Sequence, residues 1–379
     1  MMKALMLAPM GSVHRRFNKA NIDALLNLNF QIELAANFSN GNGPESQNQQ
    51  FVEECAKKGI VTHSIPFERR SLKGSLKCLP QVKQLLREGN YDIVHAHTET
   101  GGLILKLAKN AKGESKFFYT PHGMSFWKGS SLKSQIVFRP LERWICSSMD
   151  ANLAMNNEEY QTLKNWNART AKFVHGIGLD VSRFKSKENS DLRNEIGLSN
   201  QDVVLLSVGE LDDNKNHAVV LKAMSQIKEH CPHYIVCGVG PNKDYLLEMA
   251  KEYGLQENLH LLGYRCDIPA VIRSANIFVF PSFHEGLPVS LMEAMAGGLP
   301  VICSEIRGNV DLIKPGYNGF LFQPDNSNQL KDYLVKLIED FELRKEISHH
   351  NVIDIENYSY NVVVEELKQL YLTYPSKSF

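Results

Sequence analysis

The sequence lacks any apolar stretch long enough to cross a bilayer. A membrane-spanning helix needs about 18 apolar residues in a row, and the apolar runs of this chain are much shorter. Near its start a short apolar run precedes Arg15 and Arg16, which reverses the order of basic and apolar segments in a secretory signal peptide. We therefore expect a cytoplasmic protein, with any membrane contact peripheral and at the inner face of the plasma membrane.

The cysteines form no recognisable pattern. The seven cysteines are an odd number and form neither a C-x-x-C motif nor a cluster with histidine at metal-ligand spacing. This usage is typical of a reducing compartment and argues against a disulfide framework. The sequence also lacks G-x-G-x-x-G after its first strand-like run, where Met10, Gly11 and Ser12 stand instead. A nicotinamide-dependent dehydrogenase is therefore the weakest alternative among nucleotide-binding enzymes.

The net charge is zero, but the two halves of the chain carry opposite excess charge. Residues 1–178 contain 23 Lys and Arg against 14 Asp and Glu, whereas residues 179–379 contain 19 against 28. The densest basic cluster is residues 69–77. This excess favours an anionic partner such as an anionic membrane surface, where each cation contributes about 1 kcal/mol. Nucleic acid is not expected, because no aromatic-rich basic face accompanies the charge.

Apolar strand-like runs alternate with amphipathic helical stretches along the chain, which is typical of parallel α/β folds. A length of 379 residues suits two domains. We place their boundary near residues 176–181, between a first domain at 1–178 and a second at 179–357, and we expect residues 41–50 to form a polar loop. The expected strands are residues 4–8, 31–35, 93–96, 116–120, 152–155, 203–208, 234–237, 259–262, 277–280 and 301–303.

Residues 283–311 form the most informative segment. Glu285 lies in a turn after the strand expected at 277–280, and Glu293 lies about two turns into a helix. The start of such a helix offers unpaired N–H groups to a phosphate, and carboxylates accept hydrogen bonds from sugar hydroxyls. The pattern therefore predicts a nucleotide-sugar site.

This segment, with EGLP followed by EAMAGGLPVI, resembles the E-x7-E motif of retaining family-4 glycosyltransferases. The resemblance implies the GT-B fold, an α/β architecture in which two Rossmann-like domains face each other across a cleft. A C-terminal helix, here about residues 358–379, would return to the first domain. Glu293 would bind the ribose, the amides near Gly286 and Leu287 the diphosphate, and Glu285 the sugar.

The loop at residues 207–217 follows another expected strand and contains Gly209, Glu210 and Lys215. The resemblance implies that this loop borders the donor and that Lys215 neutralises the departing diphosphate. Family-4 enzymes usually have Arg where this chain has Glu210. Since a carboxylate would repel the diphosphate, we expect Glu210 to point away or another cation to substitute.

Arg265 is the neighbouring cation proposed as that substitute. It lies in the segment Leu262–Ile268, which resembles the family's G-x-x-x-D-[IV] loop that holds the nucleotide base. Tyr264 and Arg265 are therefore assigned to the donor site. Residues 237–241 follow another strand, where a glycine-rich turn explains the pattern at least as well as a ligand contact.

Histidines end two strands in the first half. His122 matches the family's [ST]-x-H-G position beside the donor sugar, and residues 95–102 resemble the H-x-H-T-x-x-G-G motif of capsule and exopolysaccharide transferases. His95 and His97 could be offered as metal ligands with Glu99, but no further His or Cys is close in sequence, so no metal site is expected.

Two further features bear on ligands. Gly11 follows the first expected strand, and its lack of a Cβ would let the backbone approach a ligand. Residues 126–149 predict a basic amphipathic helix, which lies either on a membrane or against the protein core.

The sequence therefore predicts a metal-independent, retaining transferase that needs no cofactor. It would move a hexose or N-acetylhexosamine from a nucleotide-sugar donor, expected to be UDP-linked, to a lipid-linked saccharide in surface polysaccharide synthesis. The resemblance implies that no protein nucleophile takes part, and the absence of D-x-D agrees with a reaction that needs no metal. The alternatives are a UDP-sugar 2-epimerase on the same scaffold and a catalytically silent nucleotide-sugar-binding protein.

Overall fold

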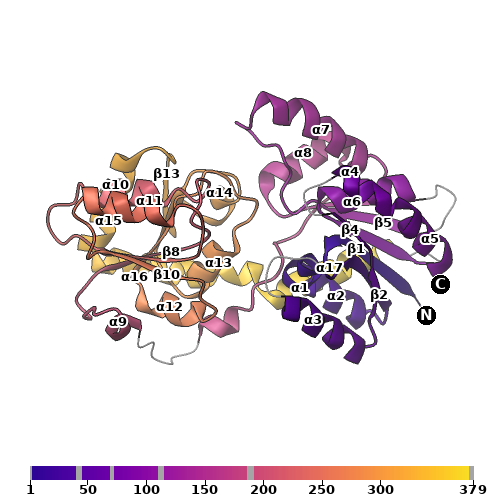
Figure 1. Cartoon of the computed structure of the whole chain (residues 1–379), viewed down its shortest axis with the longest axis horizontal. Coiled ribbons are helices and arrows are strands. Elements are labelled where there is room, and N and C mark those ends of the chain that lie inside the picture. Colours follow the sequence, from indigo (N-terminus) through magenta and orange to yellow (C-terminus); the bar gives the residue numbers. More distant parts are fainter. Residues whose placement is uncertain (1, 40–44, 69–71, 110–114, 186–191, 375–379) are drawn as a thin grey trace. The chain divides into compact units, whose positions relative to one another are not determined.

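A computed structural model of the protein describes residues 2–39, 45–68, 72–109, 115–185 and 192–374. The chain divides into two compact units (Figure 1). Unit 1 contains residues 1–178 and 360–379, and unit 2 contains residues 179–359. Each unit is an α/β domain built on a parallel sheet, which confirms the α/β class expected from the sequence.

Unit 1 is built on seven described parallel strands in the order β3-β2-β1-β4-β5-β6-β7. β1 is third in this order and pairs with both β2 and β4. The strands are β1 Lys3–Met10, β2 Gln31–Asn37, β3 Val61–Ser64, β4 Ile93–His97, β5 Lys116–Thr120, β6 Ala151–Ala154 and β7 Ala171–Phe173.

The helices of unit 1 cover both faces of this sheet (Figure 1). They are α1 Gly11–Phe17, α2 Lys19–Asn27, α3 Glu45–Lys57, α4 Leu72–Ser75, η1 Leu76–Cys78, α5 Leu79–Gly89, α6 Thr98–Ala108, α7 Leu132–Cys146, α8 Asn157–Asn167 and α17 Tyr360–Leu372. The C-terminal helix α17 packs against α2. It buries Val363, Leu367 and Tyr371 in the core of unit 1, so the end of the chain completes the first unit.

Unit 2 repeats the same plan with six described parallel strands in the order β10-β9-β8-β11-β12-β13. The strands are β8 Val204–Val208, β9 His233–Cys237, β10 Leu259–Gly263, β11 Ile277–Phe280, β12 Val301–Ser304 and β13 Gly319–Phe322. The helices are η2 Val181–Phe184, α9 Leu192–Glu195, α10 His217–Met224, α11 Lys243–Glu252, α12 Ile268–Ser274, α13 Val289–Ala296, α14 Asn309–Leu312, α15 Ser327–Glu339, α16 Phe341–Asp354 and η3 Ile355–Tyr358.

The central strands are mostly apolar because helices cover both faces of each sheet. In β11, Ile277 and Val279 pack in the core on one face, and Phe278 and Phe280 pack in the core on the other. All four side chains are almost fully buried. Because of continuous apolar runs of this kind, the central strands could be predicted from the sequence.

Three strands at the edges of the sheets were not predicted from the sequence. β3 is only partly buried, β7 has three residues, and β13 begins with a glycine. None of these short segments has the long apolar run of a central strand, so the pairing with the neighbouring strand decides their conformation.

One local prediction was wrong in part, and two predicted segments lie partly outside the described residues. The predicted polar loop at 41–50 is in part helical, because α3 begins at Glu45; residues 41–44 lie outside the described part of the chain. In the basic cluster at 69–77, residues 69–71 also lie outside that part, and the remainder forms α4 and η1.

Candidate functional site

Both sheets have the strand order 3-2-1-4-5-6 in their first six strands, the order found in dinucleotide-binding folds. Ligands of such sheets bind beyond the carboxyl ends of the strands, at the point where the strand order reverses direction. That point lies between β1 and β4 in unit 1 and between β8 and β11 in unit 2. The motifs found in the sequence follow these four strands or their neighbours.

In unit 2 the loops after β8 and β11 bring two predicted site residues together. The Lys215 Nζ lies 2.5 Å from Glu285 Oε1, and the two side chains are 20% and 15% exposed. The Lys215 ammonium also lies 5.2 Å from the centre of the Phe280 ring. An ideal Cβ at Gly209 would sit 3.2 Å from Lys215 Cδ, so this glycine leaves room for the lysine stem.

The residues that flank Lys215 join the two loops. Asn214 Nδ2 donates to the His284 carbonyl at 3.1 Å, and the Phe283 N–H donates to the Asn214 carbonyl at 2.8 Å. Asn216 adopts a left-handed conformation with φ 53°, and its Nδ2 donates to the Pro281 carbonyl at 3.2 Å. Neither asparagine was predicted as a site residue, although the pattern N-K-N in the loop after a strand was a visible signal.

Glu293 lies in the second turn of α13, which begins after Pro288. Burial raises the pKa of its carboxyl to about 7, against the opposing effect of Arg183. Gly286 and Leu287 are partly buried in the segment that leads into this helix. Glu285, Gly286 and Leu287 therefore lie in the connection between β11 and α13, and Glu293 lies in the helix that follows it.

Arg265 is not brought to the Lys215–Glu285 pair. Its Nε and Nη2 donate to the two carboxylate oxygens of Asp267 at 2.8 and 2.6 Å, within the loop that follows β10 at the edge of the sheet. Tyr264 is 73% exposed in the same loop. The proposed substitution for the missing Arg gains no support from this placement.

Glu210 is exposed, and its orientation relative to a diphosphate stays a prediction. Its contribution to the described structure is its backbone carbonyl, which accepts a hydrogen bond from His217 Nε2 at 3.2 Å. The carbonyl of Gly209, the residue before Glu210, also restricts position 238 in the neighbouring turn to glycine. A Cβ at Gly238 would lie 1.7 Å from the Gly209 oxygen, so the glycine-rich turn after β9 is explained by packing.

In unit 1 the strand ends carry histidines. His97 Nδ1 and His122 Nε2 are 3.0 Å apart and share a hydrogen bond, and the His95 and His97 rings lie 4.1 Å apart. Burial lowers the pKa of His122 to about 4 and that of His97 well below its usual value. His14 completes the group, and its pKa is lowered to about 4 for the same reason. These rings are therefore neutral at pH 7.

A long-range contact selects the tautomer of His95. Asn21 Nδ2 donates to the Tyr371 hydroxyl at 2.9 Å, which leaves the tyrosine proton for His95 Nδ1, also at 2.9 Å. His95 Nε2 then carries the ring proton and donates to Thr120 Oγ1 at 2.9 Å. Buried His97 has no partner for Nε2 among the described residues.

The loop predicted at Gly11 is instead the start of a helix, and its contact with a ligand stays a prediction. Gly11 is the first residue of α1 and follows β1 directly. A Cβ at this position would lie 2.5 Å from the Phe38 ring, so contact with Phe38 already accounts for the glycine.

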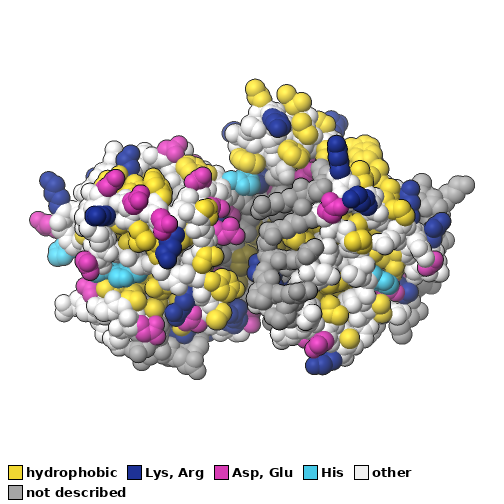
Figure 2. Space-filling view, in the orientation of Figure 1, with side chains coloured by type: hydrophobic (Ala, Val, Ile, Leu, Met, Phe, Trp, Pro, Cys, Tyr) yellow, Lys and Arg dark blue, Asp and Glu magenta, His cyan; other side chains and the backbone are white. Residues whose placement is uncertain are grey.

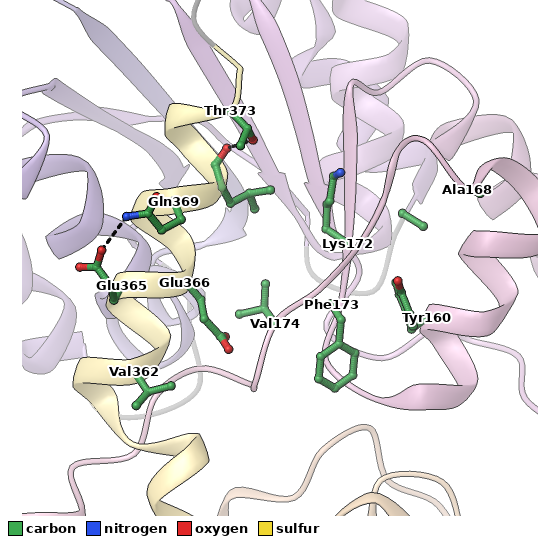
Figure 3. A pocket seen from close by; sticks show the side chains of 12 residues that line it. Tyr160, Ala168, Lys172, Phe173, Val174, Val362, Glu365, Glu366, Gln369 and Thr373 are labelled. Carbon is green, nitrogen blue, oxygen red and sulfur yellow. Dashed lines mark hydrogen bonds between the residues drawn. The ribbon is translucent and has the colours of Figure 1, made fainter.

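Unit 1 also contains a pocket of about 820 Å³ between β7 and α17. Figure 3 shows Glu365, Glu366 and Gln369 on α17 across from Lys172 and Phe173 on β7. Its carboxylates already have partners, because Glu366 accepts from His175 and Glu365 from Gln369. None of the motif residues lines this pocket.

Among the described residues, no group of three or more His, Cys, Asp or Glu side chains could hold a metal ion. In the same part of the chain, no helix is both long and apolar enough to cross a membrane.

Comparisons with known proteins match both halves of the chain. Residues 188–351 match the family model of the glycosyl transferases group 1, and residues 19–175 match that of glycosyltransferase family 4. The chain is 30% identical to EpsD of Bacillus subtilis, which is named as a glycosyltransferase, over 86% of each chain. It is 29% identical, over 80% of each chain, to an Escherichia coli galactosyltransferase named for acting on GlcNAc-diphosphoundecaprenol.

Solved structures share the fold. HepE of Anabaena in complex with UDP superimposes with a TM-score of 0.80 at 20% identity, over 98% of this chain and all of that one. Sucrose-phosphate synthase of Thermosynechococcus elongatus does so with a TM-score of 0.78 at 18% identity, over 98% of each chain. The protein is therefore a glycosyltransferase with the two Rossmann-like domains of the GT-B fold. It belongs to glycosyltransferase family 4, as the E-x7-E segment indicated.

Proposed function

We propose that this enzyme transfers a hexose or N-acetylhexosamine, with retention of configuration, from a UDP-sugar to a lipid-linked saccharide during surface polysaccharide synthesis. The observation that carries the proposal is the ion pair between Lys215 and Glu285 at the carboxyl ends of β8 and β11. An ammonium and a carboxylate at this point of the sheet offer a cation to a diphosphate and an acceptor to sugar hydroxyls.

Donor binding would exchange the partners of this pair. In the structure each charge neutralises the other. With donor bound, Lys215 would turn to the diphosphate and Glu285 would accept hydrogen bonds from the sugar. Glu293, in its ionised form, would accept hydrogen bonds from the ribose hydroxyls. The segment at Gly286 and Leu287 would face the diphosphate at the start of α13.

The chemistry would need no protein nucleophile. The acceptor hydroxyl oxygen forms a bond to the anomeric carbon while the bond from that carbon to the diphosphate oxygen breaks. The departing diphosphate takes the hydroxyl proton, which balances the reaction. Lys215 would stabilise the charge that develops on the leaving group without a metal, and neutral His122 is proposed to hydrogen-bond the sugar.

A lipid-linked acceptor agrees with a feature of α7. Its Leu132, Ile136 and Val137 side chains are 80%, 71% and 51% exposed, and Figure 2 shows hydrophobic side chains gathered over this helix. Arg139 and Arg143 lie on the same helix. Exposed apolar side chains beside cations suit contact with an anionic bilayer surface, and the Escherichia coli relative is named for an undecaprenol-linked substrate.

A thermal-shift panel of nucleoside diphosphates and their sugars, with a chelator present, tests the donor and the need for metal. We expect UDP and one or more UDP-sugars to raise the melting temperature, and Lys215→Ala to remove most of the shift. Lys222→Ala, on the exposed side of α10, is the control for loss of one positive charge. Stabilisation only by another nucleotide would reject the UDP donor.

Turnover assays separate the remaining candidates. Release of UDP that depends on a lipid-linked saccharide supports the transferase, and NMR of the product gives the configuration of the new bond. A changed nucleotide-sugar without acceptor would point to the 2-epimerase, and binding without any turnover to the silent protein.

A further inference from the structure

Arg307 reaches the Glu285 loop from a third strand end. It lies between β12 and α14 and is 6% exposed. Its Nε donates to the backbone carbonyl of Glu285 at 3.1 Å, and its Nη2 donates to His284 Nε2 at 2.8 Å. A guanidinium has fixed, planar donors, so these two contacts define the orientation of two consecutive residues.

Gly308, the residue after Arg307, contacts the same loop through its backbone. Gly308 has φ +82°, and a Cβ there would lie 2.3 Å from the Gly286 carbonyl oxygen. Only glycine adopts this conformation readily and allows so close an approach. Arg307 and Gly308 therefore hold Glu285 and Gly286 from one side, while Asn214 contacts the loop at His284.

The state of His284 follows from this contact. Burial, Arg307 and Lys215 lower the pKa of His284 to about 4, so the ring is neutral at pH 7. Because Arg307 can only donate, His284 Nε2 must accept and the ring proton must be on Nδ1. Arg307 thus selects both the backbone orientation at Glu285 and the tautomer of His284.

We propose that Arg307 is a positioning residue that holds the Glu285 backbone so that the Glu285 carboxylate meets Lys215 and then the donor sugar. This role rests on the proposed function of the Lys215–Glu285 pair. Planarity of the peptide ties the direction of the Glu285 carbonyl to that of the following N–H. Loss of the guanidinium would therefore turn the whole 285–286 segment, which in family terms carries the first Glu of E-x7-E.

The test compares Arg307→Lys with Arg193→Lys. Arg193 also donates to backbone carbonyls of unit 2, those of Ser199, Asp202 and Ser274, but Asp202 and Ser274 lie just before β8 and β11, at the amino ends of these strands. Gly308→Ala is a second variant, which disturbs the loop through Gly286 without removing a charge.

Hydrogen exchange of residues 282–288 reads the position of the loop directly. We expect faster exchange by tenfold or more in Arg307→Lys and Gly308→Ala, and no change there in Arg193→Lys. We also expect kcat to fall about 100-fold in the two loop variants, and the affinity for UDP to fall by a smaller factor because Lys215 is unchanged. Guanidinium ion added to Arg307→Ala should restore part of the lost kcat.

Unchanged exchange at 282–288 in Arg307→Lys would overturn the positioning role. So would a kcat loss no larger than that of Arg193→Lys, or a loss that guanidinium does not reduce. If the loop loosens but the parent protein neither binds UDP nor turns over a UDP-sugar, the proposed function fails and the structural role of Arg307 stands alone.

Discussion

The two units share a strand order but differ in the chemistry at their strand ends. In unit 1 the carboxyl ends of β4 and β5 carry neutral histidines, buried or partly buried, that hydrogen-bond to one another and to α17. In unit 2 the ends of β8, β11 and β12 lead to Lys215, Glu285 and Arg307. One fold therefore supports an uncharged hydrogen-bonding cluster in one copy and a charged cluster in the other.

The difference shows that overall charge is a poor guide to the charge of a site. Residues 1–178 carry an excess of Lys and Arg, yet the histidines at their strand ends are neutral. Residues 179–379 carry an excess of Asp and Glu, yet two cations lie around Glu285. Long-range charge affects partners and solubility, whereas burial and hydrogen bonding decide what a strand end can bind.

Removing a charge from the unit 2 cluster should have the largest effect. Lys215→Ala should lower kcat/KM by about 1,000-fold or more, because Glu285 is then left without its partner and repels the diphosphate. Initial rates and calorimetric titration with UDP measure the loss. Lys222→Ala should behave as the parent, and a Lys215→Ala enzyme that kept a tenth of the activity would contradict the assigned role.

Removing a histidine from the unit 1 cluster should cost less and affect a different parameter. His122→Asn should lower kcat by about 10- to 100-fold and leave the affinity for UDP unchanged. Asparagine tolerates the left-handed φ of 58° at this position, so the backbone should be preserved. Steady-state kinetics with titration of UDP check this, and a weakened UDP affinity would place His122 in the nucleotide site instead.

The Glu293 carboxyl should make unit 2 less stable as the pH rises. Its pKa is raised from 4.5 to about 7 in the folded protein, so the folded state binds more protons than the unfolded state between these values, and stability falls across that window. Glu293→Gln removes the penalty and should raise the free energy of unfolding by about 2 kcal/mol at pH 8.

The same substitution should give little gain at pH 5 and should weaken UDP binding at both pH values. Denaturant titrations of the parent, Glu293→Gln and the exposed control Glu248→Gln measure the stability. An equal gain in free energy at pH 5 and pH 8 would show that ionisation of Glu293 is not the cause.

The smallest effect is expected at Glu210. Because its side chain is exposed and its carbonyl makes the contact with His217, Glu210→Ala should retain transfer within about threefold of the parent. Parallel rate assays with Lys215→Ala provide the comparison. If the two variants lost activity alike, the Glu210 carboxylate would have a direct role in the charged cluster.

Much of the fold could be predicted because it depends on local composition. Central strands such as β5 and β11 are buried on both faces and read as continuous apolar runs. The C-terminal helix expected at about 358–379 corresponds to α17, Tyr360–Leu372. β3 and β7 could not be predicted in this way, since short strands at or near an edge bury few side chains. The start of α3 was lost for a similar reason, because its first turns are polar and resemble a loop.

The residues of the candidate site also differ in whether their local sequence was enough to predict them. Lys215, Glu285 and Glu293 were identified from motifs, because each motif is a short segment whose residue types suit phosphate or hydroxyl groups. Arg307 was missed because nothing in its own segment distinguishes it from a solvated arginine. Arg265 was proposed instead from its loop, where Asp267 turned out to be its partner.

The sequence by itself determined the α/β class, most of the strands and the chemical types of the site residues. Only the tertiary structure decided which of these residues meet. Lys215 and Glu285 are 70 positions apart, and His95 and Tyr371 are 276 apart. Such contacts depend on the order of strands in the sheet and on the loops between them, and long-range packing decides both.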